Sequence, residues 1–140
     1  GGLIKDNGIS RLYEHGVYVA SVASGWLIKN ATITGSSGAD VKAGGSAGAI
    51  VGSTLGSARL GVYAIGRGIT LSGDTVRGAF HEGLVIAAGS TVISRSIVAN
   101  SGAGYGSRAE AAVVYAGARV HQSLSRLYLR GLRVKMLHLP

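Results

Sequence analysis

The sequence contains no cysteine, one proline and no long run of apolar residues. Without cysteine, the chain can form neither disulfide bridges nor zinc–thiolate sites. No segment approaches the ~18 consecutive apolar residues that a membrane-spanning helix needs, so no membrane span is expected. The chain opens with Gly1-Gly2, followed at once by Lys5 and Asp6, so no signal peptide is expected in it.

Acidic residues are scarce as well. Fourteen Lys and Arg residues stand against six Asp and Glu residues, which gives a formal net charge of +8. A charge of this sign favours an anionic partner such as acidic polysaccharide, nucleic acid or anionic lipid. The basic residues are spread along the chain instead of clustering with aromatic residues, so nucleic acid is the less favoured partner. No cofactor is expected, and no set of His, Asp and Glu has the spacing of metal ligands.

Glycine, in contrast, is abundant, and small residues recur at a regular step. A small residue opens an alternating apolar stretch at six places: Gly16, Gly38, Gly61, Gly83, Ala112 and Gly131. The steps between these markers are 22, 23, 22, 29 and 19 residues. Together they equal the 115 residues that separate two near-copies, ISRLYEHGVYV (9–19) and LSRLYLRGLRV (124–134). The chain is therefore predicted to be a repeat protein with coils starting near 16, 38, 61, 83, 112 and 131.

Each repeat of about 22 residues holds two or three short stretches of alternating apolar residues, separated by Gly, Ser or Asn. A unit of this size cannot bury its own apolar face, whereas stacked copies can. We therefore predict one all-β domain over 1–140, a parallel β-solenoid of five to six coils whose strands lie ~4.8 Å apart. The predicted polar row beside the core is Thr32, Thr54, Thr75, Ser96 and Ser123.

Two segments, GITLSGDTVRGAFHEGLVI (68–86) and STVISRSIVANSGAG (90–104), resemble coils of right-handed parallel β-helices. Such coils occur in the pectate-lyase-like superfamily, in phage tailspikes and in adhesins. The resemblance covers nearly the whole chain and implies a right-handed, single-stranded β-helix. The clustered aspartates, the Asp-Asp dipeptide and the Asp-Pro-His-Glu signature of the superfamily's enzymes are missing. The resemblance therefore implies an architecture and carries over no catalytic residue.

Functional residues are expected in the turn before each marker residue, because insertions there do not disturb the stack. This turn is longest before Ala112, where a loop over 99–110 is inserted. The same turn of the two preceding coils carries charged and aromatic residues that can serve acid–base chemistry and hold a carboxylate. The predicted catalytic residues are His81, Glu82 and Glu110, and the predicted substrate-binding residues are Arg59, Arg108, Tyr105 and Phe80.

A second candidate patch on the first coil consists of Tyr13, Glu14 and His15. It lies three coils from His81, or roughly 14 Å at the spacing of parallel strands, so the two patches cannot form one dyad. Tyr18 and Tyr63 share a column and are interpreted as a stacked tyrosine ladder. Asp6 and Asp40 are interpreted as turn or surface residues, and Asp74 and Arg95 as weaker candidates for the site.

Two functions fit these patterns. The first is a noncatalytic β-helix scaffold or binding module that contacts anionic polysaccharide or a cell-surface glycan, located outside the cell or on a cell or virion surface. The second is a small carbohydrate-active enzyme, a lyase or hydrolase, that uses the charged edge. Surface ion pairs between coils, worth ~0–1 kcal/mol, also explain that edge. The open ends of a β-helix favour pairing with another copy, so a homo-oligomer is a further expectation.

Overall fold

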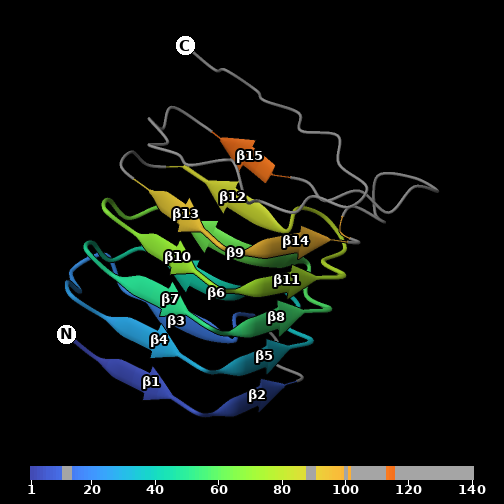
Figure 1. Cartoon of the computed structure of the whole chain (residues 1–140), viewed down its shortest axis with the longest axis horizontal. Coiled ribbons are helices and arrows are strands. Elements are labelled where there is room, and N and C mark those ends of the chain that lie inside the picture. Colours follow the sequence, from blue (N-terminus) through green and yellow to red (C-terminus); the bar gives the residue numbers. More distant parts are fainter. Residues whose placement is uncertain (11–13, 88–90, 100, 102–112, 116–140) are drawn as a thin grey trace.

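The chain winds into a stack of short parallel strands. A computed structural model describes residues 1–10, 14–87, 91–99, 101 and 113–115. In these residues the strands form three five-stranded parallel sheets, and successive strands along the chain belong to each of the three sheets in turn. No helix occurs in these residues (Figure 1). The described residues form a parallel β-solenoid of about four turns, which confirms the predicted fold class. The predicted number of five to six coils is too high for the described residues, and the coil predicted near 131 lies outside them.

Each full turn contributes one strand to each sheet. Sheet A consists of β1 (Leu3–Lys5), β4 (Leu27–Lys29), β7 (Ala49–Val51), β10 (Thr70–Ser72) and β13 (Val92–Ser94). Sheet B consists of β2 (Gly8–Ser10), β5 (Thr32–Thr34), β8 (Thr54–Gly56), β11 (Thr75–Arg77) and β14 (Ile97–Ala99). Sheet C consists of β3 (Val17–Val19), β6 (Ala39–Ala43), β9 (Leu60–Ala64), β12 (Leu84–Ile86) and β15 (Val113–Tyr115).

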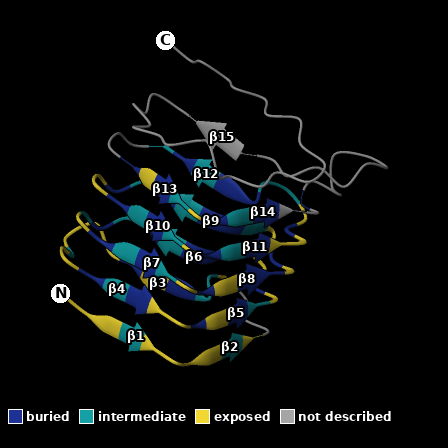
Figure 2. Cartoon of the chain, in the orientation of Figure 1, coloured by how far each residue is buried: buried dark blue, intermediate teal, exposed yellow. Residues whose placement is uncertain are grey.

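The core is a set of aliphatic columns inside the coil. In the three-residue strands of sheets A and B the middle side chain points inward, so equivalent residues of successive turns stack in register. Most of the interior-facing residues are dark blue in Figure 2, and the outward positions carry both polar residues and apolar ones such as Leu3 and Val92. The two columns are Ile28, Ile50, Leu71 and Ile93 in sheet A, and Ile33, Leu55, Val76 and Val98 in sheet B.

The strand register confirms most of the predicted phase and corrects one marker. Val17 pairs with Val41, Val41 with Val62, and Val62 with Leu84, so Gly16, Gly61 and Gly83 are equivalent. The residue of the second turn in this column is Asp40, two positions after the predicted Gly38. The long step to the 112 marker is confirmed, because β15 begins opposite β12 with Leu84 beside Val113.

Single residues with positive φ make the corners of the solenoid. One lies between sheets A and B on every turn, and others lie between B and C and between C and A. Glycine adopts this conformation without cost, whereas an L-residue with a Cβ costs roughly 1–2 kcal/mol. The corner residues are Asp6, Asn30, Gly52, Gly73 and Arg95 (A to B), Gly35, Ser57 and Gly78 (B to C), and Gly25, Ala47 and Gly68 (C to A).

Ala47 and Gly68 lie at the corner between sheets C and A on consecutive turns, and they provide a matched test of this cost. Ala47 is exposed with φ 48°, so Ala47→Gly is expected to raise the free energy of unfolding by about 0.5–1 kcal/mol. Gly68 has φ +66° and room for a methyl group, so Gly68→Ala is expected to lower it by about 1 kcal/mol. Urea unfolding followed by circular dichroism measures both, and changes of the same sign would contradict this account.

Candidate functional site

The predicted charged edge lies at the corner between sheets B and C. The His81 N–H donates to the Arg59 carbonyl oxygen at 2.8 Å, and the Phe80 N–H donates to the Ala58 carbonyl oxygen at 2.8 Å. Arg59 and His81 are therefore neighbours on consecutive turns, as predicted. Arg59 is exposed, and His81 and Glu82 are half-buried.

Phe80 gives this corner an aromatic surface. Its side chain is 56 % exposed, and its ring meets the His81 imidazole edge to face with a 5.0 Å distance between the ring centroids. The remaining predicted members of the edge lie outside the described residues. These members are Tyr105, Arg108 and Glu110, together with most of the inserted loop 99–110.

One residue of the second predicted patch, His15, has a structural role. The His15 Nδ1 accepts a hydrogen bond from the Ala39 N–H at 3.0 Å, which leaves the ring proton on Nε2. The ring lies against Gly38, where an added Cβ would be 2.7 Å from Nδ1. Glu14 is exposed, and Tyr13 lies outside the described residues. His15 therefore ties the first turn to the second, and Gly38 is glycine because a Cβ there would overlap both the Glu14 carbonyl oxygen and this ring.

The structure confirms the predicted Thr/Ser row for three turns only. Thr32, Thr54 and Thr75 are in register on the outer face of sheet B, but the next residue in the column is Ile97 instead of Ser96. Ser123 lies outside the described residues. Ser96 belongs to a buried polar column one residue earlier, at the corner between sheets A and B.

Asp74 is the centre of this buried column. Its Oδ1 accepts from the Ser53 N–H at 2.8 Å and its Oδ2 from the Ser72 N–H at 3.0 Å, while its own N–H donates to the Ser96 Oγ at 3.1 Å. Burial raises the pKa of Asp74 to about 6, and the two N–H donors act in the opposite direction. The carboxylate satisfies backbone groups of two turns, so its role in this position is structural.

Asp40 is a buried carboxyl that sequence reasoning placed at a turn or on the surface. It is fully buried in β6, and its Oδ1 accepts from the Ser36 hydroxyl at 2.9 Å. Within the described residues Oδ2 has no hydrogen-bond partner. Burial raises the pKa of Asp40 to about 7, with smaller opposing effects of hydrogen bonds from the Ser36 side chain and from the backbone N–H groups of Gly56 and Ser36. The expectation was wrong because the side chain enters the interior at a position that is glycine on neighbouring turns.

The outer face of sheet C carries a column that sequence reasoning described only in part. Tyr18, Lys42 and Tyr63 occupy equivalent outward positions on three consecutive turns. The predicted tyrosine ladder is therefore interrupted, because Lys42 lies between the two rings. The Lys42 Nζ is 5.4 Å from the centroid of the Tyr18 ring, within the range of a cation–π contact. We call these three residues the sheet C column.

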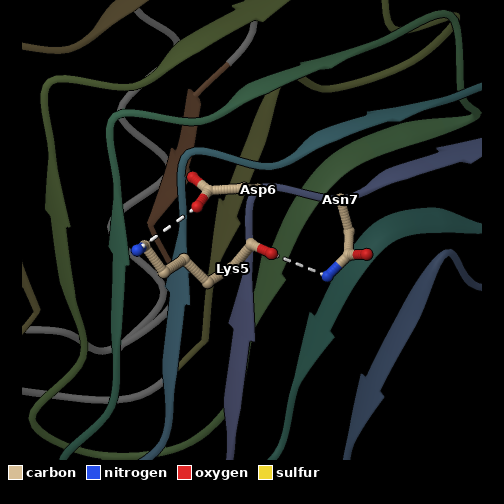
Figure 3. A network of polar contacts seen from close by, with 3 residues as sticks. All are labelled: Lys5, Asp6 and Asn7. Atoms are coloured by element: carbon tan, nitrogen blue, oxygen red, sulfur yellow. Dashed lines mark hydrogen bonds and ion pairs between the residues drawn. The ribbon is translucent and has the colours of Figure 1, made fainter.

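Charges are distributed unequally between surface and interior. Of the five described acidic residues, Asp40 and Asp74 are buried, and Asp6 forms an exposed ion pair with Lys5 at 3.3 Å (Figure 3). In the same corner Asn7 donates from Nδ2 to the Lys5 carbonyl oxygen. Six of the seven described basic residues are exposed and the seventh, Lys42, is half-buried. The exposed ones are Lys5, Lys29, Arg59, Arg67, Arg77 and Arg95.

Comparison of the chain with protein-family models, curated proteins and solved structures gave no match. The resemblance to the pectate-lyase-like superfamily is therefore supported at the level of a parallel β-solenoid and no further. Within the described residues, no group of three or more His, Cys, Asp or Glu could hold a metal ion. The described part of the chain also has no helix of the length and apolarity needed to cross a membrane.

Proposed function

We propose that this solenoid is a noncatalytic binding module for anionic polysaccharide. The observation that carries the proposal is the separation of charge: the interior takes up two of the five described carboxyls, while the basic side chains stay on the surface. The outside of the coil is therefore more basic than the composition alone indicates. Three of these cations, Lys5, Lys29 and Arg77, lie on strands of the rigid stack, which suits an extended polyanion with regularly spaced carboxylates.

This function implies a location outside the cell or on a cell or virion surface, where acidic polysaccharides are found.

Binding is tested with polygalacturonate, using uncharged dextran as the control polymer. Attraction between exposed charges weakens as the Debye length falls from ~10 Å at 0.1 M salt to ~3 Å at 1 M salt. We expect retention on immobilised polygalacturonate that is lost over this range, and no retention on dextran. Equal retention on both polymers, or none on either, would contradict the proposal.

An alternative function is a small lyase or hydrolase acting on the same polymers. It is favoured by the position of His81 next to Arg59 on consecutive turns, with Glu82 beside it. Incubation of the protein with soluble polygalacturonate distinguishes the two functions when unsaturated products and reducing ends are followed over time. Turnover that is abolished by His81→Ala and by Glu82→Gln would establish the enzyme, whereas binding without turnover supports the module.

A further inference from the structure

The sheet C column combines aromatic and cationic side chains in a regular array. Tyr18, Lys42 and Tyr63 lie on consecutive turns, so their backbones are spaced by the ~4.8 Å that separates parallel strands. Tyr18 is 61 % exposed, and Lys42 and Tyr63 are half-buried. The column ends at Val85, which follows Tyr63 in register and carries a small aliphatic side chain. Three consecutive turns therefore present ring, cation and ring along the axis of the solenoid.

The charge of Lys42 remains available to a ligand. Its Nζ contacts the Tyr18 ring, and no carboxylate of the described residues lies within ion-pair distance of it. A ring attracts an ammonium without neutralising it, so Lys42 is positioned and still cationic. The His15 ring lies 6.2 Å from that of Tyr18, between centroids, and enlarges the aromatic surface at this end of the column.

We infer that the sheet C column binds three consecutive residues of an acidic polysaccharide that lies along the solenoid axis. This inference rests on the proposed function and names the site and the ligand register. The turns repeat every ~4.8 Å along the axis, so three consecutive sugar units of an extended chain can lie beside three consecutive turns. The first and third units place their apolar C–H faces on Tyr18 and Tyr63, and the carboxylate of the middle unit meets Lys42.

The pair Lys5 and Lys29 provides a matched control on another face. These two residues are adjacent in register at the outer surface of sheet A, where their neighbours in the strands are Leu3 and Leu27. This face therefore has cations without aromatic rings.

Single-stranded nucleic acid also combines stacking with negative charge, so it is the competing ligand that the experiment must address.

The length of the ligand tests the register directly. Calorimetric titration of the unsubstituted chain with galacturonate oligomers of two to six units is expected to show affinity rising steeply from the dimer to the trimer and little thereafter. Oligo(dT) of similar charge is expected to bind more weakly. A gradual rise with every added unit, or tighter binding of oligo(dT), would overturn the inference.

Substitutions then locate the site. Lys42→Gln, Tyr18→Ala and Tyr63→Ala are each expected to weaken trimer binding about tenfold, the equivalent of ~1.4 kcal/mol. Lys29→Gln removes the same charge from sheet A, outside the column, and is expected to weaken trimer binding much less than Lys42→Gln does. Tyr18→Phe retains the ring and is expected to bind like the unsubstituted chain. Thermal unfolding of each variant shows whether it is folded.

Chemical footprinting locates the binding site on the unsubstituted chain. Saturating trigalacturonate is expected to protect Lys42 from acetylation several-fold more than Lys29, as read by mass spectrometry. If the chain binds polygalacturonate but equal protection and unchanged variant affinities are found, the column is not the site and the proposed function stands. If the chain binds no polyuronate at all, the proposed function fails as well.

Discussion

Gly48→Ala is expected to lower the free energy of unfolding by several kcal/mol. Gly48 is buried directly before β7, in register with Trp26 before β4. A Cβ on Gly48 would overlap the Trp26 indole at Cε2, Cδ2 and Nε1. The indole is 5 % exposed and packed in the core cluster, so it has no free volume to enter.

The backbone cannot relieve this overlap by moving. The Ala49 N–H donates to the Trp26 carbonyl oxygen at 2.9 Å, and the Thr70 N–H donates to the Gly48 carbonyl oxygen at 2.9 Å. Both neighbouring turns therefore hold the strand at its spacing. Overpacking in a well-packed core costs typically 1–3 kcal/mol and more where the structure cannot yield. Because each turn of a solenoid is stabilised by its neighbours, damage between the second and third turns weakens the stack on both sides.

Equilibrium unfolding in urea, followed by circular dichroism, measures this effect. Gly8→Ala is the matched control, because a Cβ there would have no atom within 4 Å. It is expected to change stability by less than about 0.5 kcal/mol. In the double variant Trp26→Leu/Gly48→Ala, leucine vacates the space of the indole, so the two losses are expected to be less than additive by more than about 1 kcal/mol. Gly48→Ala with the stability of the unsubstituted chain would contradict this packing.

The solenoid could be predicted from the sequence because its two strongest signals are local. Short alternating stretches recur at nearly constant steps, and a β-branched or leucine residue fills the same inward position on each turn. The strand register confirms Ile33, Leu55 and Val76 as one such column, whereas its fourth member is Val98 instead of the predicted Ile97. Parallel stacking is the arrangement that brings such positions together, so the fold class follows from spacing alone.

The error at Gly38 shows where spacing is insufficient. Gly16 is glycine because a Cβ there would overlap the Ile33 side chain, whereas a Cβ on Gly38 would meet the Glu14 carbonyl oxygen and the His15 ring. Sequence alone cannot distinguish these two reasons for a glycine. The true equivalent of Gly16 is Asp40, and aspartate in a glycine-rich stretch is typical of turns. Burial of that side chain depends on contacts with Ser36 that only the folded coil creates.

The candidate site illustrates the same limit. Arg59 and His81 were correctly placed on consecutive turns, because the turn before sheet C has a recognisable start. Lys42 was not expected between Tyr18 and Tyr63, because shifting Gly38 to Asp40 moves the second turn by two residues. A shift of two residues retains which side chains face outward and changes which of them are neighbours. The composition of an outer face is thus more sensitive to phase than the core is.

The stability of this protein is expected to fall as the pH rises from about 4 to about 7. Burial raises the pKa of Asp40 from its ordinary 3.8 to about 7 and that of Asp74 to about 6. Between these values the folded chain binds more protons than the unfolded chain, so the free energy of unfolding decreases with increasing pH. A shift of this size for Asp40 corresponds to at most about 4 kcal/mol, lost progressively up to about pH 7 and constant above it.

Asparagine substitutions separate the two carboxyls. In Asp40→Asn the carbonyl oxygen still accepts from Ser36, and the amide replaces the protonated oxygen of the acid. This variant is therefore expected to match the unsubstituted chain near pH 4.5 and to exceed its stability by a few kcal/mol near pH 8. In Asp74→Asn the amide faces either the Ser53 or the Ser72 N–H, so that variant is expected to be destabilised at both pH values.

Urea unfolding at intervals between pH 4 and pH 9 measures these dependences for the three proteins. Near pH 8 the order of stability is expected to be Asp40→Asn, then the unsubstituted chain, then Asp74→Asn. A rise in the stability of the unsubstituted chain between pH 4 and pH 7 would mean that Asp40 is ionised without penalty in the folded state. Its buried Oδ2 would then need a hydrogen-bond donor that the described residues do not supply, because an unpaired ionised oxygen cannot remain buried without cost.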